Sequence, residues 1–279
     1  MTYQLRGRRW LAGGCGALVA VAATMAGTLV PAAPALAGSN AGTTTGASAA
    51  ASTPTSSITD VNRLNLIKTE SARLIARRVA SLQAAEQVVG AKAFLGSDGT
   101  AVATGMQDDI SGLEALGAKI QADTILSQAR QDRDLIYTQF RVYYLVLPVA
   151  TNVIDVDFSS NVGVTGMDQD ITQLQGYVNT ANQGVLGPIV TGMADQVHIA
   201  TTATAGLSAQ LLSYTPAEWN ANHRLLANAG VDIRTADRAL QVAGNDLARA
   251  DRYLRQGVAG GQAPKAQPDL GRKGHGPKR

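Results

Sequence analysis

The chain of 279 residues contains one cysteine, Cys15, which lies in an N-terminal segment that we expect to be removed. The remaining residues therefore contain no thiol. Disulfide bonds and thiol chemistry are excluded for them, so packing alone must stabilise any fold that they form.

Aromatic residues make up only 4% of the chain, and there are three histidines, His198, His223 and His275. The apolar content is mainly Ala, Leu, Val and Ile, which favours closely packed helices over a large mixed α/β enzyme. The histidines do not have the spacing of metal ligands, and no phosphate-binding loop, dinucleotide fingerprint or nucleophile elbow is present. The sequence therefore predicts no metal, no cofactor and no catalytic residue, and indicates a protein that is not an enzyme.

Acidic residues are absent from positions 1–37. Three arginines near the start precede an apolar run from Trp10 to Val30, which leads to Ala35-Leu36-Ala37. This pattern is typical of a signal peptide, and we expect cleavage near Ala37 to leave no membrane span. The protein would then be secreted or associated with the cell envelope. An uncleaved anchor is the alternative, because the run is long enough to cross a bilayer.

Residues 38–57 carry no charge and consist almost entirely of Gly, Ser, Thr and Ala, which predicts a disordered linker. Three of the 24 basic residues belong to the signal, which leaves 21 basic against 21 acidic residues. The balance is uneven, because residues 257–279 contain five basic residues and one acidic residue, Asp269. The candidate anion-binding residues of this basic, disordered tail are Lys265, Arg272, Lys273, Lys278 and Arg279. A tail that only aids solubility is the alternative.

Between residues 58 and 256, apolar residues recur at steps of three and four, which predicts amphipathic helices. The expected helices cover residues 59–89, 98–122, 124–148, 167–178, 186–211 and 222–256, with Gly257 ending the last one. Asp98 or Thr104 would cap the second helix. Thr215-Pro216-Ala217-Glu218 has the pattern of a capping box. Glycines and serines within residues 158–166 are expected to break or fray the helix there.

The segment from Leu135 to Leu147 is apolar on all sides except at Gln139 and Arg141. We therefore expect it to lie in a central, fully buried helix, with Pro148 kinking that helix or opening the next one.

The last helix has the most regular pattern. Large apolar residues stand seven apart at Leu226, Ile233, Leu240, Leu247 and Leu254, and alanines stand seven apart at Ala229, Ala236, Ala243 and Ala250. Such a repeat is typical of coiled-coil packing. The predicted fold is all-α, an elongated antiparallel helical bundle with coiled-coil-like heptad seams.

One cluster of aromatic residues surrounds an arginine, and its members are Tyr137, Phe140, Arg141, Tyr143 and Tyr144. Aromatic rings around a cation are a candidate pocket for an anionic or sugar ligand. The alternative is core packing, with Arg141 paired to a carboxylate.

The segment Phe140–Pro148 resembles a family of secreted bacterial all-helical proteins with no assigned function. The same resemblance extends to Asp109–Leu113, Lys119-Ile120, Ala122–Thr124 and Thr215-Pro216. It covers about residues 58–256. The resemblance implies a helical fold and no particular chemistry.

These patterns favour a secreted or envelope-associated protein, not an enzyme, that acts in binding, spacing or scaffolding. Its partners are unknown, with other envelope proteins and anionic cell-surface polymers as candidates. One alternative is binding of anionic polymers or nucleic acid through the basic tail, with steep salt dependence. Another is a hydrolase that uses carboxylates such as Asp155 and Asp157.

Overall fold

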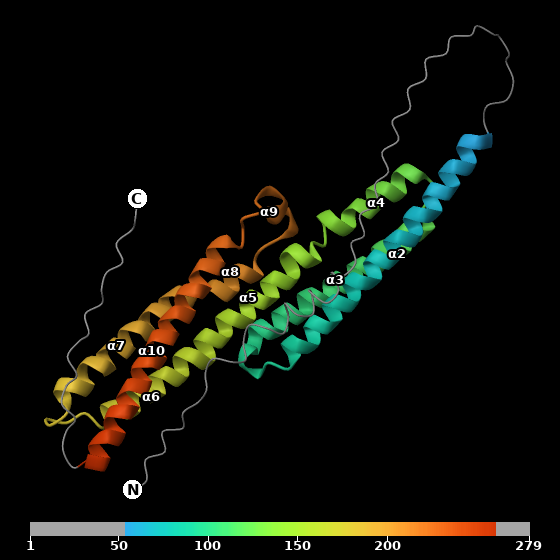
Figure 1. Cartoon of the computed structure of the whole chain (residues 1–279). Coiled ribbons are helices and arrows are strands. Elements are labelled where there is room, and N and C mark those ends of the chain that lie inside the picture. The colour runs from blue at the N-terminus through green and yellow to red at the C-terminus, as the bar shows by residue number, and fades with distance from the viewer. Residues whose placement is uncertain (1–53, 261–279) are drawn as a thin grey trace, which may run out of the picture. The chain divides into compact units, whose positions relative to one another are not determined.

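The computed structural model describes residues 54–260, and it describes side chains for residues 58–257. The predicted signal peptide, most of the linker and the tail beyond Gly260 lie outside the described residues. Within residues 54–260 every regular element is helical and there is no strand, so the all-α prediction is confirmed (Figure 1). These residues divide into two compact units. The N-terminal unit comprises residues 54–158 and 206–230, and the C-terminal unit comprises residues 159–205 and 231–260.

The N-terminal unit is built on a pair of long helices, α2 (Pro54–Gly90) and α3 (Gly96–Ala122). They lie side by side and antiparallel, joined through the short 3-10 helix η1 (Ala93–Leu95) (Figure 1). Gly96 has a φ of 52°, which a residue without a side chain adopts easily, and this lets the chain turn sharply into α3. At the other end of the pair, Lys68 Nζ donates to Gln121 O at 2.7 Å, and Gln121 Nε2 donates to Lys68 O at 3.0 Å.

The rest of the N-terminal unit packs against this pair. It consists of α4 (Leu126–Thr138), the π-helix η2 (Val142–Val146), α5 (Leu147–Asp157), α8 (Leu207–Leu212) and α9 (Pro216–Ala221). The apolar stripes of α2, α3, α4, η2, α5 and α8 supply the buried side chains of this unit. Its largest fully buried side chains are Leu82, Met106, Leu113, Ile120, Ile136, Val142, Val153, Val156 and Leu211. The three- and four-residue spacing seen in the sequence thus produces the buried faces.

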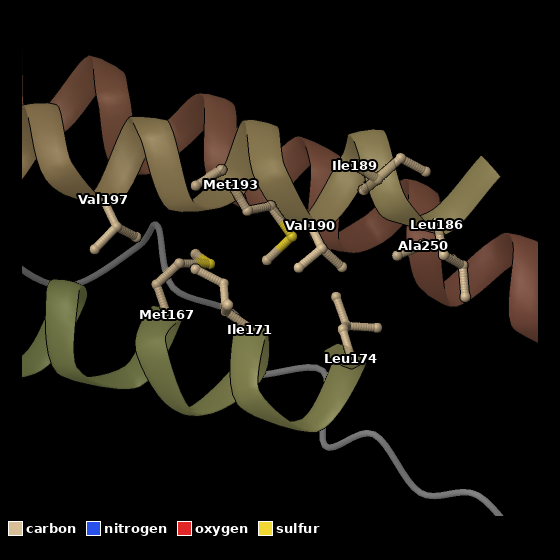
Figure 2. Close-up of a cluster of buried hydrophobic side chains, with 10 residues drawn as sticks. Met167, Ile171, Leu174, Leu186, Ile189, Val190, Met193, Val197 and Ala250 are labelled. Carbon is tan, nitrogen blue, oxygen red and sulfur yellow. The ribbon is translucent and has the colours of Figure 1, made fainter. Parts of the chain in front are cut away.

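The C-terminal unit is held together by α6 (Thr165–Gln175), α7 (Gln183–Thr204) and α10 (Ala227–Gly260). Figure 2 shows Met167, Ile171 and Leu174 of α6 pointing toward the apolar side chains of α7. The α7 residues of this cluster are Leu186, Ile189, Val190, Met193 and Val197. Ala243 and Ala250 of α10 complete the same cluster and are fully buried.

Burial along α10 differs from the expectation for a leucine seam. The four alanines of the repeat are buried, whereas Leu240, Leu247 and Leu254 are only half-buried. The small residues therefore provide the closest approach to neighbouring helices. The helix also begins at Ala227, five residues later than expected, and continues past Gly257 to Gly260. Coiled-coil packing of this repeat stays a prediction.

The prediction of one continuous, buried helix over residues 124–148 is wrong. Helix α4 ends at Thr138, Arg141 takes a left-handed conformation with a φ of 41°, and the chain resumes as η2. Pro148 then lies in the first turn of α5, where a missing N–H costs nothing. Tyr144 is 62% exposed, so burial on every side is also wrong.

Two further predictions about helix interruptions need correction. The segment 158–166 does not break, because the chain stays helical there as the π-helix η3 (Phe158–Val164). The predicted helix 186–211 is interrupted at Gly206, whose φ is 69°. A π-helix accommodates an extra residue per turn without leaving the helical path.

Of the two cap predictions, the one for α3 is wrong and the one for α9 is confirmed. Leu95, and neither Asp98 nor Thr104, occupies the N-cap position of α3, and it makes no side-chain cap. The capping box of α9 is confirmed: Thr215 Oγ1 accepts from the Glu218 N–H, and Glu218 Oε2 accepts from the Thr215 N–H at 2.8 Å. None of the helices within residues 54–260 is both long enough and apolar enough to cross a membrane.

Candidate functional site

The five residues of the predicted aromatic pocket lie around the break between α4 and η2. Tyr137 stands in the last turn of α4, Phe140 and Arg141 form the break, and Tyr143 and Tyr144 belong to η2. Phe140 is buried against α3, where its ring covers Gly112. Because Phe140 faces the core and Tyr144 faces solvent, the five side chains do not form one pocket around Arg141.

Arg141 is bound on the other side of the break, by α9. Its Nε donates to Asn220 Oδ1 at 2.7 Å, and Asn220 Nδ2 donates to Thr138 O at 2.9 Å. The partner of Arg141 is thus an amide, whereas the core-packing alternative expected a carboxylate. Asn220 satisfies a carbonyl that the end of α4 leaves without an intrahelical partner. The contact fixes Arg141 in its unusual backbone conformation.

The arginine that the tyrosines do surround is Arg78 of α2. Its guanidinium carbon lies 4.8 Å from the centre of the Tyr137 ring and 5.3 Å from the centre of the Tyr143 ring. Both distances are within the range of cation–π attraction. Arg78 is only 7% exposed, and its Nη1 donates to Leu74 O at 3.3 Å. We call Arg78, Tyr137 and Tyr143 the Arg78 corner.

Arg78 is not among the candidate residues predicted from the sequence, because α2 carries several other arginines and these are exposed. The signal was present. Arg78 stands three residues after Ile75 and four before Leu82, so it occupies a position on the apolar stripe itself. A charged residue at a buried stripe position is rarer than an apolar one and indicates a specific partner.

Tyr143 is held in place by α2. Its hydroxyl oxygen lies 3.2 Å from Ser81 Oγ and donates to Arg77 O at 3.5 Å. Ser81 is itself buried and donates to Arg77 O at 2.9 Å. These bonds fix the ring beside Arg78, so the corner is formed before any ligand arrives.

The charge of Arg78 has no acidic counterpart among the described residues. Ion pairs within residues 54–260 join Arg63 to Asp60, Lys119 to Asp132, Arg133 to Glu70 and Arg255 to Asp251, and none includes Arg78. Two exposed arginines, Arg73 and Arg77, lie close by on α2. They add positive charge to this face of α2, while the exposed Asp134 stands one turn before Tyr137 on α4.

Two buried carboxylates of the N-terminal unit have a side-chain partner, while Asp123 Oδ2 is buried without a hydrogen-bond partner among the described residues. Lys119 Nζ donates to Asp132 Oδ1 at 2.9 Å, and this bond raises the pKa of Lys119. Ser208 Oγ donates to Asp157 Oδ1 at 2.7 Å, while burial raises the pKa of Asp157. On α3, burial and the neighbouring Asp108 raise the pKa of Asp109 to about 6.

The two carboxylates of the hydrolase hypothesis, Asp155 and Asp157, both lie on α5. Residues two apart on a helix point roughly 200° away from each other. Asp157 is buried beside Ser208 and Asp155 is half-buried, so the structure does not bring the two together as an acid–base pair.

The remaining candidates from the sequence are the histidines and the basic residues of the tail. His198 and His223 are exposed, and the ring of His223 packs edge-on against Trp219 at 5.8 Å. No group of three His, Cys, Asp or Glu residues suitable for a metal occurs in the part of the chain that the structure describes. Lys265, Arg272, Lys273, Lys278 and Arg279 lie outside the described residues, as does His275.

A shallow groove of about 420 Å³ runs between α2 and α3 on the face away from Arg78. Small side chains of α2 line it, among them Ala72, Ala76 and Ala80, together with Gly117 of α3. The polar side chains that line the groove are Gln83, Glu114 and Gln121.

Comparison with known proteins does not extend these observations: no family model, no curated protein and no solved structure matches the chain.

Proposed function

We propose that the chain is a secreted or envelope-associated helical protein that binds and positions other molecules instead of transforming them. The observation that carries this proposal is the Arg78 corner. It gathers a buried cation and two aromatic rings, which together can recognise a ligand. The signal pattern of residues 1–37 supports a place outside the cell or in its envelope.

The roles of the acidic residues support a binding function over a hydrolytic one. Asp132 is paired with Lys119, Asp157 accepts from Ser208, and Glu218 completes the capping box of α9. Each of these contacts stabilises a helix or joins two helices. A glycosidase, in contrast, needs two carboxylates facing each other across a cleft, at roughly 5 to 9 Å.

A binding experiment tests the proposal. The mature chain, residues 38–279, is immobilised and incubated with isolated envelope polymers, and the retained and released material is analysed. We expect saturable retention with the polymer unchanged. Cleavage of the polymer that a single carboxylate substitution abolishes would overturn the proposal and establish an enzyme.

The basic tail is a second candidate binding element, since it carries five basic residues against Asp269. The deletion that tests it must spare α10, which extends to Gly260. Removal of residues 261–279 takes away all five basic residues and leaves the helix intact. If the tail binds anionic polymers, this deletion should abolish salt-sensitive retention, and retention that survives the deletion argues against the tail.

A further inference from the structure

We propose that Arg78 is the receptor for an oxyanion, a carboxylate or phosphate group of a ligand that binds beside Tyr137 and Tyr143. The inference rests on the proposed binding function, to which it gives a site and a ligand class. It depends on the described residues of the N-terminal unit and does not involve the basic tail.

The charge of Arg78 is not compensated by an acidic group among the described residues. A guanidinium that is 7% exposed has lost most of its hydration, and such a group normally has a carboxylate partner. Here the compensation comes from one carbonyl, Leu74 O, and from two tyrosine rings. These are weaker than a full negative charge, so the site keeps an attraction for an anion.

Two of the three guanidinium nitrogens of Arg78 have no hydrogen-bond partner among the described residues. Of the guanidinium nitrogens, Nη1 donates to Leu74 O, while Nε and Nη2 make no hydrogen bond with the described residues. Some polar atoms of the described core, such as Arg133 Nε, are fully buried and have no hydrogen-bond partner. Nε and Nη2 of Arg78 are not among these atoms. Neither nitrogen is therefore completely sealed within the described core, in a residue that is 7% exposed. Together they form one edge of the planar fork that binds two oxygens of a carboxylate or phosphate.

The Arg78 corner is ordered before a ligand binds. Tyr143 is fixed through Ser81 and the Arg77 carbonyl, and Tyr137 is fixed at the end of α4, whose last carbonyl groups Asn220 helps to satisfy. Arg78 is thus in contact with two rings, one of them hydrogen-bonded to α2, and this order lowers the entropic cost of binding. The exposed Arg73 and Arg77 add positive charge to this face of α2, which the exposed Asp134 of α4 offsets in part.

Nuclear magnetic resonance on the mature chain with ¹⁵N-labelled arginine tests the inference directly. Inorganic phosphate, acetate and chloride are titrated separately at equal ionic strength while the Nε–Hε signals are followed. We expect the Arg78 signal to shift saturably with phosphate and acetate and not with chloride. Two charge-assisted hydrogen bonds without an enclosing cavity correspond to a Kd on the order of 1 mM.

Two matched variants separate Arg78 from its neighbour. Arg78→Lys keeps the charge and loses the fork, so its Kd for phosphate should rise about tenfold. Arg77→Lys makes the same change at an exposed position one residue earlier and should leave the Kd unchanged. Equal Kd values for the two variants would overturn the inference. Should Arg78→Lys fail to fold, the wild-type titration still decides.

The result also separates this inference from the wider proposal. Shifts confined to Arg272 and Arg279 would place the anion on the tail and overturn the Arg78 site, while the chain would still be a binding protein. Cleavage of an envelope polymer would overturn the proposed function, and with it the ligand role assigned to the Arg78 site.

Discussion

Gly112 of α3 provides the surface on which the ring of Phe140 rests. A Cβ atom placed on Gly112 would lie 2.6 Å from Phe140 Cε1, a distance that real Cβ atoms do not reach. Phe140 is 5% exposed and stands in the break between α4 and η2. The glycine therefore allows the aromatic ring to hold the break against α3.

Replacing Gly112 by alanine should destabilise the N-terminal unit. Overpacking costs typically about 1 to 3 kcal/mol, and the better helix propensity of alanine returns about 1 kcal/mol, so a net loss of about 1 kcal/mol is expected. Trp219 is the one tryptophan of residues 38–279 and belongs to this unit. Denaturant unfolding followed by its fluorescence gives the free energy of unfolding.

Gly105→Ala is the matched control on the same helix. Nothing lies within 4 Å of a Cβ at this exposed position, so the substitution should stabilise by about 0.5 to 1 kcal/mol. Equal effects at the two positions would mean that Phe140 does not rest on Gly112.

Periodicity predicted the long helices well because it reports which side chains are buried. The expected helices at 59–89 and 98–122 correspond to α2 and α3 with small errors at the ends. The capping box of α9 was predictable for a similar reason, since Thr215 and Glu218 act within one turn. Local patterns predict local structure when no distant contact opposes them.

The break at residues 139–141 was not predictable from the local sequence, which contains neither glycine nor proline there. It depends on residues far away in the chain: Phe140 needs the space above Gly112, and Arg141 needs the amide of Asn220. The Arg78 corner depends on the same break, because the turn of the chain brings Tyr137 and Tyr143 to α2. Only the tertiary contacts decide which arginine the tyrosines surround.

Asp109 should make stability depend on pH. Its pKa is raised from 3.8 to about 6, so the folded chain holds a proton that the unfolded chain releases between these values. Stability should therefore fall as the pH rises from about 4 to 6. Asp109→Asn should remove this dependence and, since the group is partly exposed, raise the free energy of unfolding at pH 7 by about 1 kcal/mol.

Unfolding curves of both proteins across this pH range provide the measurement. Asp108→Asn is the control: Asp108 is the smaller cause of the shift, so its loss should lower the pKa of Asp109 slightly and keep most of the pH dependence. If the free energy of unfolding of the wild type rose between pH 4 and 6 as much as that of Asp109→Asn, Asp109 would not be the source of the pH dependence.

The capping box should control the order of α9. Thr215→Ala removes the hydroxyl that accepts from the Glu218 N–H and should cost about 1 kcal/mol locally. The bonds from Thr215 to the Glu218 carboxylate lower the pKa of that group. The stabilisation from these bonds is therefore fully present above the ordinary pKa of a glutamate. It is lost as the pH falls through the pKa that Glu218 has in the folded chain. Hydrogen exchange at the Trp219 and Asn222 amides measures the effect.

Thr215→Ser is the control, because serine keeps the hydroxyl and the backbone N–H. Exchange at both amides should match the wild type in this variant and accelerate in Thr215→Ala. Comparable acceleration in the two variants would attribute the effect to the lost methyl group and would remove the role of the cap.

The alanine repeat of α10 makes a last prediction about the C-terminal unit. Ala243 is fully buried in the cluster that Met193 of α7 and Ile171 of α6 share, whereas Val242 beside it is 39% exposed. Ala243→Leu adds three carbons where α10 approaches its neighbours and should cost about 3 kcal/mol. Val242→Leu adds one carbon at the surface and should change stability by less than about 0.5 kcal/mol.

Circular dichroism during unfolding reports this unit as well, while Trp219 fluorescence reports only the N-terminal unit. Ala243→Leu should therefore shift the dichroism transition and leave the fluorescence transition in place. If the two leucine variants were equally stable, the alanines would not be the contact positions of α10. The heptad pattern would then have another cause, such as pairing between two copies of the chain, because a seam between chains has the same sequence spacing as a seam within one.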